Sequence, residues 1–232
     1  MKHDINTIAD LSGIVEEEFR DKGNTTVIYR GHGAVSYTLK PSVGRESPPQ
    51  HILGAVNESL MLELFRNQSA DRVTIAPIDD WELLAIARHH GLYTRLLDWT
   101  RNPLVALYFA VCKEHEPALN KQEDAEIIAW RCQKIELGKL PKCGPLKIRK
   151  VERYIPRIVT PRLRAQSGIF TVHPKPQNIF HPPGSVTNLR IPWRYRKSLK
   201  ASLFRHGIHE AALFPDLDGL ARHIDWCQTK CY

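Results

Sequence analysis

The segment LVALYFAVCKEH, residues 104–115, constrains the fold most because its helical pattern has almost no polar face. Asn102-Pro103 precedes it, and a proline in the first turn of a helix sacrifices no hydrogen bond. A helix that is apolar on every side must be covered on every side. We therefore expect a helix that opens at Asn102-Pro103 and lies buried in the centre of the molecule.

The remaining segments divide between helical and extended patterns. Apolar residues recur with helical spacing in residues 6–20, 55–68, 79–90, 193–207 and 216–228. Strand-like runs occupy 25–32, 126–132, 169–172 and 209–215, with shorter extended pieces at 37–45, 92–100 and 158–159. Helices and strands interleave without strict alternation, which favours an α+β fold with a mixed central sheet and flanking helices. No repeat or clear linker divides the chain, so we expect a single domain over residues 1–232.

Several classes of protein are disfavoured by composition. No apolar run approaches the roughly 20 residues that cross a bilayer, and the acidic start lacks the apolar centre of a signal peptide. The five cysteines are odd in number and scattered, which fits reduced thiols. Cys227 and Cys231 have no partner His/Cys pair nearby in sequence, so we expect no zinc site. These features predict a cytoplasmic protein without membrane contact.

The positive charge is concentrated in one part of the chain. Residues 139–206 contain 16 Lys and Arg against one acid, Glu152, whereas residues 1–138 contain 15 against 20. Such a block repels itself unless it is spread over a surface or meets an anion. The sequence therefore indicates either a polyanionic partner such as nucleic acid or a nucleotide, or a solvated basic face that offsets the acidic first half.

Polar residues stand at the ends of three predicted strands, where scaffolds often present functional groups. The first is Arg30-Gly31, where a planar guanidinium suits phosphate and the glycine allows close backbone approach. The alternative for Arg30 is a structural ion pair to Asp98 or Glu210. The third is His209-Glu210, where a carboxylate at the mouth of a buried strand suits a sugar hydroxyl or an oxocarbenium-like cation. Its alternative is a solvated charge at a strand edge.

The second cluster is the stretch from His89 to Thr100. Alternation along an extended segment places Thr94, Asp98 and Thr100 on one face. Thr100 with Asn102 also fits a helix cap, and either histidine fits the end of the preceding helix. The spacing of these groups matches no known metal pattern.

Four segments together resemble the FRG domain family. They are IYRGH, ARHHGLYTRLLDWTRNPLVALYFA, RLRAQSGIFTVHP and HGIHEAALFPDLDGLARHI, which span about residues 25–225. The family's aromatic-Arg-Gly motif reads Tyr29-Arg30-Gly31 here, with tyrosine in place of phenylalanine.

The resemblance implies a plan similar to that of ADP-ribosyltransferases, which cleave NAD and transfer ADP-ribose. By this likeness Arg30 holds a ribose or phosphate of NAD, the Gly31 backbone receives the carboxamide and Glu210 grips the ribose hydroxyl. Thr100 or Asp98 replaces the usual serine of the middle motif. We expect the nucleotide site to include His90, Thr94 and Arg95 as well.

The resemblance also implies a role as a toxin or in defence against phages. A nucleic-acid acceptor bound by residues 139–206 and a neutralising antitoxin would fit such a role. Two alternatives stay open: a non-catalytic module that binds nucleic acid or nucleotide, and a metal-dependent nuclease. Walker, GxGxxG, HExxH and Ser-His-Asp motifs are missing from the sequence.

Overall fold

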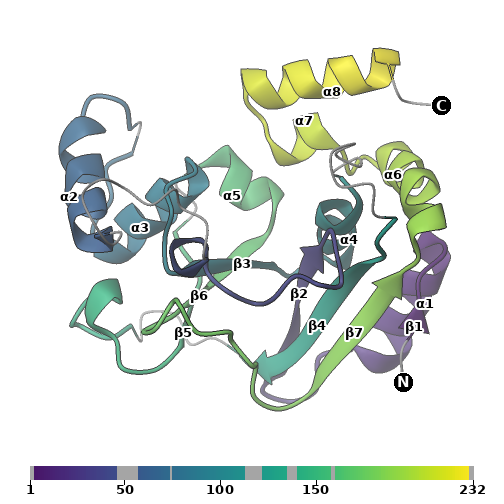
Figure 1. Cartoon of the computed structure of the whole chain (residues 1–232), viewed down its shortest axis with the longest axis horizontal. Helices are drawn as coiled ribbons and strands as arrows, with labels where there is room; N and C mark the ends of the chain where they lie inside the picture. The colour runs from purple at the N-terminus through teal and green to yellow at the C-terminus, as the bar shows by residue number, and fades with distance from the viewer. Residues whose placement is uncertain are drawn as a thin grey trace.

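A computed structural model describes residues 3–45, 57–73, 75–112, 122–134, 140–157 and 160–229. Within these residues, seven strands form one mixed sheet in the order β1-β7-β4-β2-β3-β6-β5 (Figure 1). The strands are β1 (His3–Asp4), β2 (Thr25–His32), β3 (Leu96–Thr100), β4 (Ala125–Gln133), β5 (Glu152–Tyr154), β6 (Gly168–Val172) and β7 (Val186–Ile191). The helices are α1 (Ile8–Glu18), α2 (Glu58–Gln68), α3 (Asp80–His89), α4 (Pro103–Val111), α5 (Pro161–Ala165), α6 (Arg196–Arg205), α7 (Glu210–Leu213) and α8 (Leu217–Thr229). The expected α+β class with a mixed sheet is confirmed.

The sheet is continuous on one side of β2 and nearly interrupted on the other. β2 pairs with β4 in antiparallel register along its whole length, from Thr25–Gln133 to His32–Glu126. On its other edge, β2 pairs with β3 through one residue pair, Tyr29–Thr100. The two parts of the sheet therefore meet at a narrow junction, and the strands separate beyond it.

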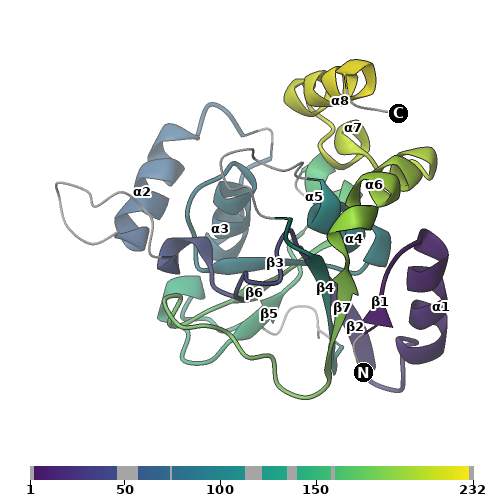
Figure 2. The ribbon, with the colours of Figure 1, turned by 45° about the vertical axis from the view of Figure 1, so that its right-hand side comes forward.

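Helix α4 lies against one face of the sheet, as its apolar sequence predicts. Figure 2 shows α1, α4 and α6 on the same side of β2, β4 and β7. Val105, Ala106, Leu107 and Ala110 are at most 1% exposed, so the helix is covered all round. Asn102 caps its first turn by accepting a hydrogen bond from the amide of Leu104 at 2.9 Å.

Gly31 allows α4 to approach the sheet. A Cβ added at Gly31 would lie 2.0 Å from the carbonyl oxygen of Ala106 and 2.7 Å from the amide nitrogen of Ala110. The absence of a side chain at Gly31 therefore serves the packing of a helix on a strand, whereas the sequence suggested access for a ligand.

Two further clusters complete the core. One joins α2 and α3 to β5 and β6 through Trp81, Leu84 and Phe170, and the other covers the face of the sheet around Trp99 and Trp130. Leu96 belongs to the first cluster, while Leu97 and Trp99 belong to the second. The predicted alternation along β3 is thus confirmed.

Two extended predictions are wrong. Residues 37–45 form a loop with a short 3-10 helix, η1 (Ser42–Gly44), in place of an extended piece. The expected strand at 209–215 is instead the short helix α7, because the His209 side chain caps it by accepting a hydrogen bond from the Ala212 amide at 3.3 Å. The extended piece expected at 158–159 lies outside the described residues.

The structure also bears on the cysteines and on membranes. Among the described residues, Cys132 is a buried free cysteine and Cys143 is an exposed one. Among the described residues, no helix combines the length and apolar character needed to cross a bilayer.

Candidate functional site

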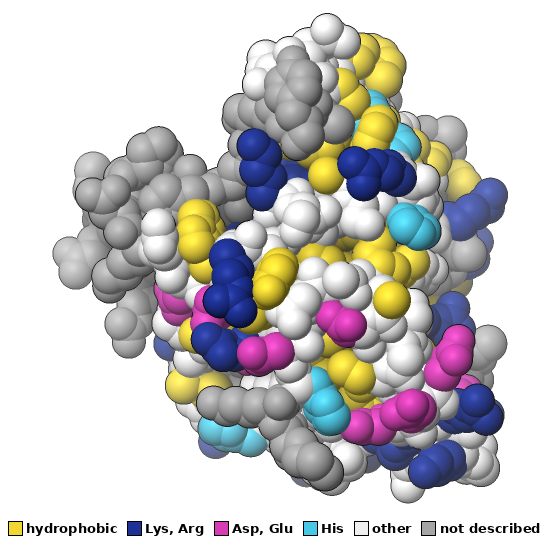
Figure 3. All heavy atoms as spheres, turned by 90° about the vertical axis from the view of Figure 1, so that its right-hand side faces the viewer, with side chains coloured by type: hydrophobic (Ala, Val, Ile, Leu, Met, Phe, Trp, Pro, Cys, Tyr) yellow, Lys and Arg dark blue, Asp and Glu magenta, His cyan; other side chains and the backbone are white. Residues whose placement is uncertain are grey.

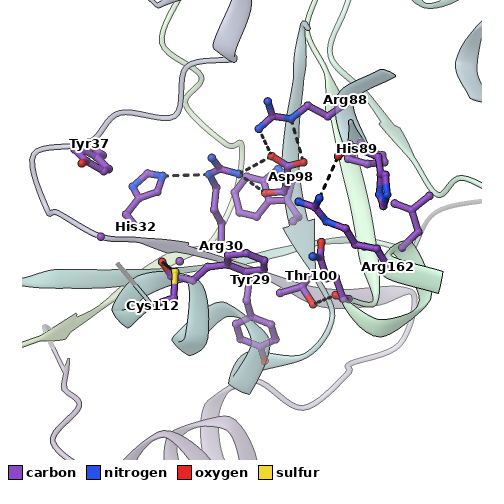
Figure 4. Close-up of a pocket in the computed structure, with 18 of the residues that line it drawn as sticks. Tyr29, Arg30, His32, Tyr37, Arg88, His89, Asp98, Thr100, Cys112 and Arg162 are labelled. Atoms are coloured by element: carbon purple, nitrogen blue, oxygen red, sulfur yellow. Dashed lines mark hydrogen bonds and ion pairs between the residues drawn. The ribbon is translucent and has the colours of Figure 1, made fainter. Parts of the chain in front are cut away.

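A pocket of about 790 Å³ opens where β2 and β3 separate. Its walls come from β2 and the loop that follows, the end of α3, β3, α4, α5 and β6 (Figure 4). The described residues that line it are Tyr29, Arg30, Gly31, His32, Gly33, Ser36, Tyr37, Thr38, Arg45, Arg88, His89, Gly91, Asp98, Trp99, Thr100, Phe109, Cys112, Arg162, Leu163, Gln166, Gly168 and Phe170. Its volume falls in the range of roughly 300–1,000 Å³ that is typical of small-molecule sites.

Arg30 projects from β2 across the gap toward β3. Its Nη1 donates a hydrogen bond to the backbone carbonyl of Asp98 and lies 3.6 Å from the Asp98 Oδ2. Its Nε donates to Nε2 of His32 at 3.2 Å. Burial lowers the pKa of Arg30 to about 10, while Asp98 opposes this shift, so the guanidinium is charged at neutral pH.

Asp98 is held chiefly by Arg88, at the end of α3. Arg88 binds the carboxylate in a bidentate manner, donating from Nε to Oδ1 at 3.3 Å and from Nη2 to Oδ2 at 2.8 Å. Burial alone would raise the pKa of Asp98, but Arg88 and then Arg30 outweigh it and lower the pKa to about 2. The side chain is 45% exposed and lines the pocket. The carboxylate is therefore ionised and open to a ligand.

Two more arginines face the same space. Arg45, whose Nε donates to the Lys40 carbonyl at 3.1 Å, follows η1. Arg162, on α5, donates to the His89 carbonyl at 3.1 Å. Among the described lining residues Asp98 is the one acid, so four guanidiniums face a single carboxylate. The pocket has a strong excess of positive charge.

The two lining histidines add little to this charge near neutral pH. Burial lowers the pKa of His89 to about 4, with Arg162 contributing. Burial also lowers the pKa of His32, although its hydrogen bond to Glu126 acts in the opposite direction. Aromatic rings of Tyr37, Phe109 and Phe170 supply apolar surface beside the guanidiniums, and Tyr37 is 58% exposed.

Of the residues predicted from the sequence, Arg30, Gly31, Asp98 and Thr100 line this pocket. The ion pair between Arg30 and Asp98, which was the alternative interpretation, is confirmed. Thr100 is 5% exposed, and its hydroxyl donates to the Gln166 carbonyl at 2.7 Å. That hydroxyl also accepts from the Asn102 amide at 3.0 Å, so it is engaged in joining β3 to its neighbours.

Three of the residues predicted to bind the nucleotide, Thr94, Arg95 and His90, do not line the pocket. Thr94 is completely buried, and its backbone amide and carbonyl are both bonded to the Ser42 hydroxyl. Arg95 points toward α2, where its Nε donates to Glu58 Oε2 at 2.8 Å. His90 is the exposed C-cap residue of α3, and its neighbour His89 takes the place in the pocket wall.

Glu210 lies apart from Arg30, in a second pocket of about 280 Å³. It begins α7, so the expected position at the mouth of a strand is wrong. Its carboxylate accepts hydrogen bonds from the Tyr108 hydroxyl and from Nε of Arg222, the latter at 2.8 Å. Residues of α4 and Cys112 lie between the two pockets, and Cys112 lines both. The convergence of Arg30 and Glu210 on one cleft is therefore not observed.

Sequence reasoning missed Arg45, Arg88 and Arg162, which supply most of the charge. A usable signal exists for Arg88 alone: it follows the buried run from Trp81 to Ala87, where a charged residue needs a partner. Arg45 and Arg162 reach the pocket from a loop and a short helix, and neither position is marked by periodicity.

Comparison with known families agrees with the sequence motifs. The family model described as FRG domain matches residues 25–118. Within these residues the chain is similar to FRG domains, as its motifs indicate. The matched FRG segment includes Arg30, Arg88 and Asp98, while Arg162 and Glu210 lie beyond it. No curated protein and no solved structure gives a match to the chain.

Several arginines beyond the matched segment bind groups that lie earlier in the chain. Arg157 pairs with buried Glu82 at 2.7 Å, and Arg190 pairs with Asp124 and Asp4. Arg196 donates to the Gly33 carbonyl at 2.9 Å. In Figure 3 basic and acidic side chains are intermixed on the face that is shown. Part of the basic charge of residues 139–206 is thus neutralised within the chain.

Proposed function

We propose that the pocket between β2 and β3 binds a phosphate-bearing nucleotide, with NAD as the first candidate. The observation that carries this proposal is the group of four arginines, Arg30, Arg45, Arg88 and Arg162, around the single carboxylate of Asp98. Guanidinium groups bind phosphate oxygens through paired, charge-assisted hydrogen bonds. Because one positive charge is compensated by Asp98, the remaining excess suits a diphosphate.

The shape of the pocket supports a ligand larger than a simple phosphate. Phe109 and Phe170 give apolar walls, and Tyr37 offers an exposed ring at the edge. Base rings stack on such aromatic and guanidinium surfaces. A dinucleotide has a diphosphate between two ring systems. The arginines of the pocket suit the diphosphate, and its aromatic side chains suit the rings.

Binding is tested by titration calorimetry with NAD, ADP-ribose and uncharged adenosine. Arg45→Gln removes one positive charge without touching the Asp98 pair, and we expect it to weaken ADP-ribose binding by about tenfold or more. Arg72→Gln is the matched control, since Arg72 is 78% exposed and pairs only with its neighbour Asp71 among the described residues. Equal affinity for adenosine and ADP-ribose, or equal effects of the two variants, would contradict the proposal.

ADP-ribosyl transfer is a second candidate, favoured by the ionised carboxylate of Asp98 beside Arg30. A carboxylate can stabilise the oxocarbenium-like cation that forms as the bond between ribose and nicotinamide breaks. In this arrangement Asp98 takes the part that the sequence suggested for Glu210, because Glu210 lies in the second pocket.

Labelled NAD, incubated with separate pools of protein, RNA and DNA, tests this candidate and the nucleic-acid acceptor. Transfer of label by the wild type and its loss in Asp98→Asn are expected. Binding of NAD without nicotinamide release would instead favour a non-catalytic nucleotide-binding module. A toxin or phage-defence role, with a neutralising partner, would follow only from observed transfer.

A further inference from the structure

The direction of the Arg30 side chain is fixed from two sides. Its Nη1 is bonded to the Asp98 carbonyl, and its Nε is bonded to Nε2 of His32. The side chain is 13% exposed, so these bonds lie largely out of contact with water. Among the described residues no hydrogen bond is made by its Nη2, which leaves this nitrogen able to meet a ligand.

The contact with Arg30 determines where His32 carries its proton. An arginine Nε always donates, so Nε2 of His32 must accept and must be unprotonated. The proton of the neutral ring is then on Nδ1, which lies 3.3 Å from Oε1 of Glu126. Oε2 of Glu126 accepts in turn from Nδ2 of Asn188 at 2.9 Å. The resulting chain of hydrogen bonds crosses β2, β4 and β7.

These partners are placed by the sheet itself. His32 and Glu126 are directly opposite each other in the β2–β4 register, and Arg30 lies two residues before His32 on the same face of β2. His32 is 4% exposed and Glu126 is 8% exposed. A buried carboxylate with both oxygens bonded holds the ring in one orientation.

We propose that His32 and Glu126 are positioning residues, which hold the Arg30 guanidinium in the orientation that binds an anionic ligand. This inference rests on the proposed anion-binding function of the pocket. The positioning role requires a neutral His32. Protonation of Nε2 would remove the acceptor of the Arg30 Nε hydrogen bond and bring two N–H donors face to face.

The charged groups around His32 act in opposite directions. Glu126 on β4 favours the protonated ring, whereas Arg30 on β2 and Arg45 in the following loop oppose it. Tyr37 contacts the ring edge-on, with centroids 6.2 Å apart. Burial opposes protonation most strongly and lowers the pKa of His32.

The test measures affinity for inorganic pyrophosphate and for ADP-ribose as a function of pH. In the wild type we expect affinity to fall at least about tenfold as the pH drops through the pKa of His32, because Arg30 loses its anchor. His32→Gln retains an acceptor for Arg30 but cannot be protonated, so its pH step should vanish. Glu126→Gln removes the anion that favours protonation, so its step should move to lower pH.

Two results would overturn the inference. The first is an affinity that rises as His32 is protonated, since its added charge would then act directly on the ligand. The second is a pH profile that Glu126→Gln leaves unchanged. Thermal unfolding of each variant confirms that it is folded.

A ligand-free measurement separates this inference from the proposed function. The ¹⁵N shifts of the His32 ring near neutral pH should show Nδ1 protonated and Nε2 unprotonated. The opposite tautomer would overturn the positioning role whatever the ligand data. The expected tautomer in a protein that binds neither pyrophosphate nor ADP-ribose would refute the anion-binding function, and with it the positioning role.

Discussion

Replacing Gly31 with alanine should destabilise the protein severely. The added Cβ would lie 2.0 Å from the Ala106 carbonyl oxygen and 2.7 Å from the Ala110 nitrogen, and both atoms belong to the backbone of α4. Ordinary contact between such atoms requires about 3.4 Å or more, so α4 would have to move by more than 1 Å from β2. Overpacking of a core typically costs about 1–3 kcal/mol and occasionally more. Because backbone and not a flexible side chain must give way, we expect about 3 kcal/mol.

Gly33→Ala is the matched control. It lies two residues further along the same segment, and its Cβ would be 3.8 Å from the nearest atom, Nη2 of Arg196. Its expected change in the free energy of unfolding is within about 0.5 kcal/mol. Denaturant unfolding measures both variants, and thermal unfolding should show a decrease of roughly 6–12 °C for Gly31→Ala. Similar stability of the two variants would refute the packing argument.

Three further outcomes are expected. Asp98→Asn removes the single described carboxylate of the pocket, so ADP-ribose should bind more tightly in calorimetry, and weaker binding would contradict the charge argument. If Asp98 also stabilises the oxocarbenium-like cation, any NAD cleavage should disappear in the same variant. Thr100→Val breaks the hydrogen bond to the Gln166 carbonyl and should cost about 1–3 kcal/mol in denaturant unfolding, with unchanged ligand affinity. A loss of affinity without a loss of stability would instead indicate that the hydroxyl contacts the ligand. His173 is buried, and burial lowers its pKa to about 4, so as the pH falls the unfolded chain is protonated at this residue before the folded protein is. The free energy of unfolding should therefore decline as the pH falls from about 6.5 toward 4, and His173→Gln should reduce that decline in unfolding curves. An unchanged decline in the variant would mean that other groups cause it.

The sequence predicts those parts of the fold that depend on a local pattern. The all-apolar segment after Pro103 can only be a covered helix, and the β-branched run that ends at His32 can only be a buried strand. The segment at 209–215 fails because four residues, Glu210–Leu213, are too few for helical periodicity to appear. A histidine side chain that caps the helix also gives no distinctive sequence signal.

The site is predictable only in part for the same reason. Arg30 and Asp98 are marked as charged residues within apolar strands, and both line the pocket. The pairing of Asp98 with Arg88 depends on how α3 packs on the sheet, which no spacing in the sequence reveals. Glu210 is likewise separated from Arg30 by the placement of α4 and α7, and residue types alone cannot show that separation.

The early parting of β2 and β3 creates two inner edges in the middle of a sheet, where main-chain groups are usually hidden by a neighbouring strand. Arg30 donates a hydrogen bond to one such group, the Asp98 carbonyl, where a neighbouring strand would otherwise supply the donor. A molecule that entered this gap would lie beside the two strand edges as well as beside the arginines. Substitutions other than to proline leave these peptide groups in place, so any contact with them would persist through changes of the side chains around it.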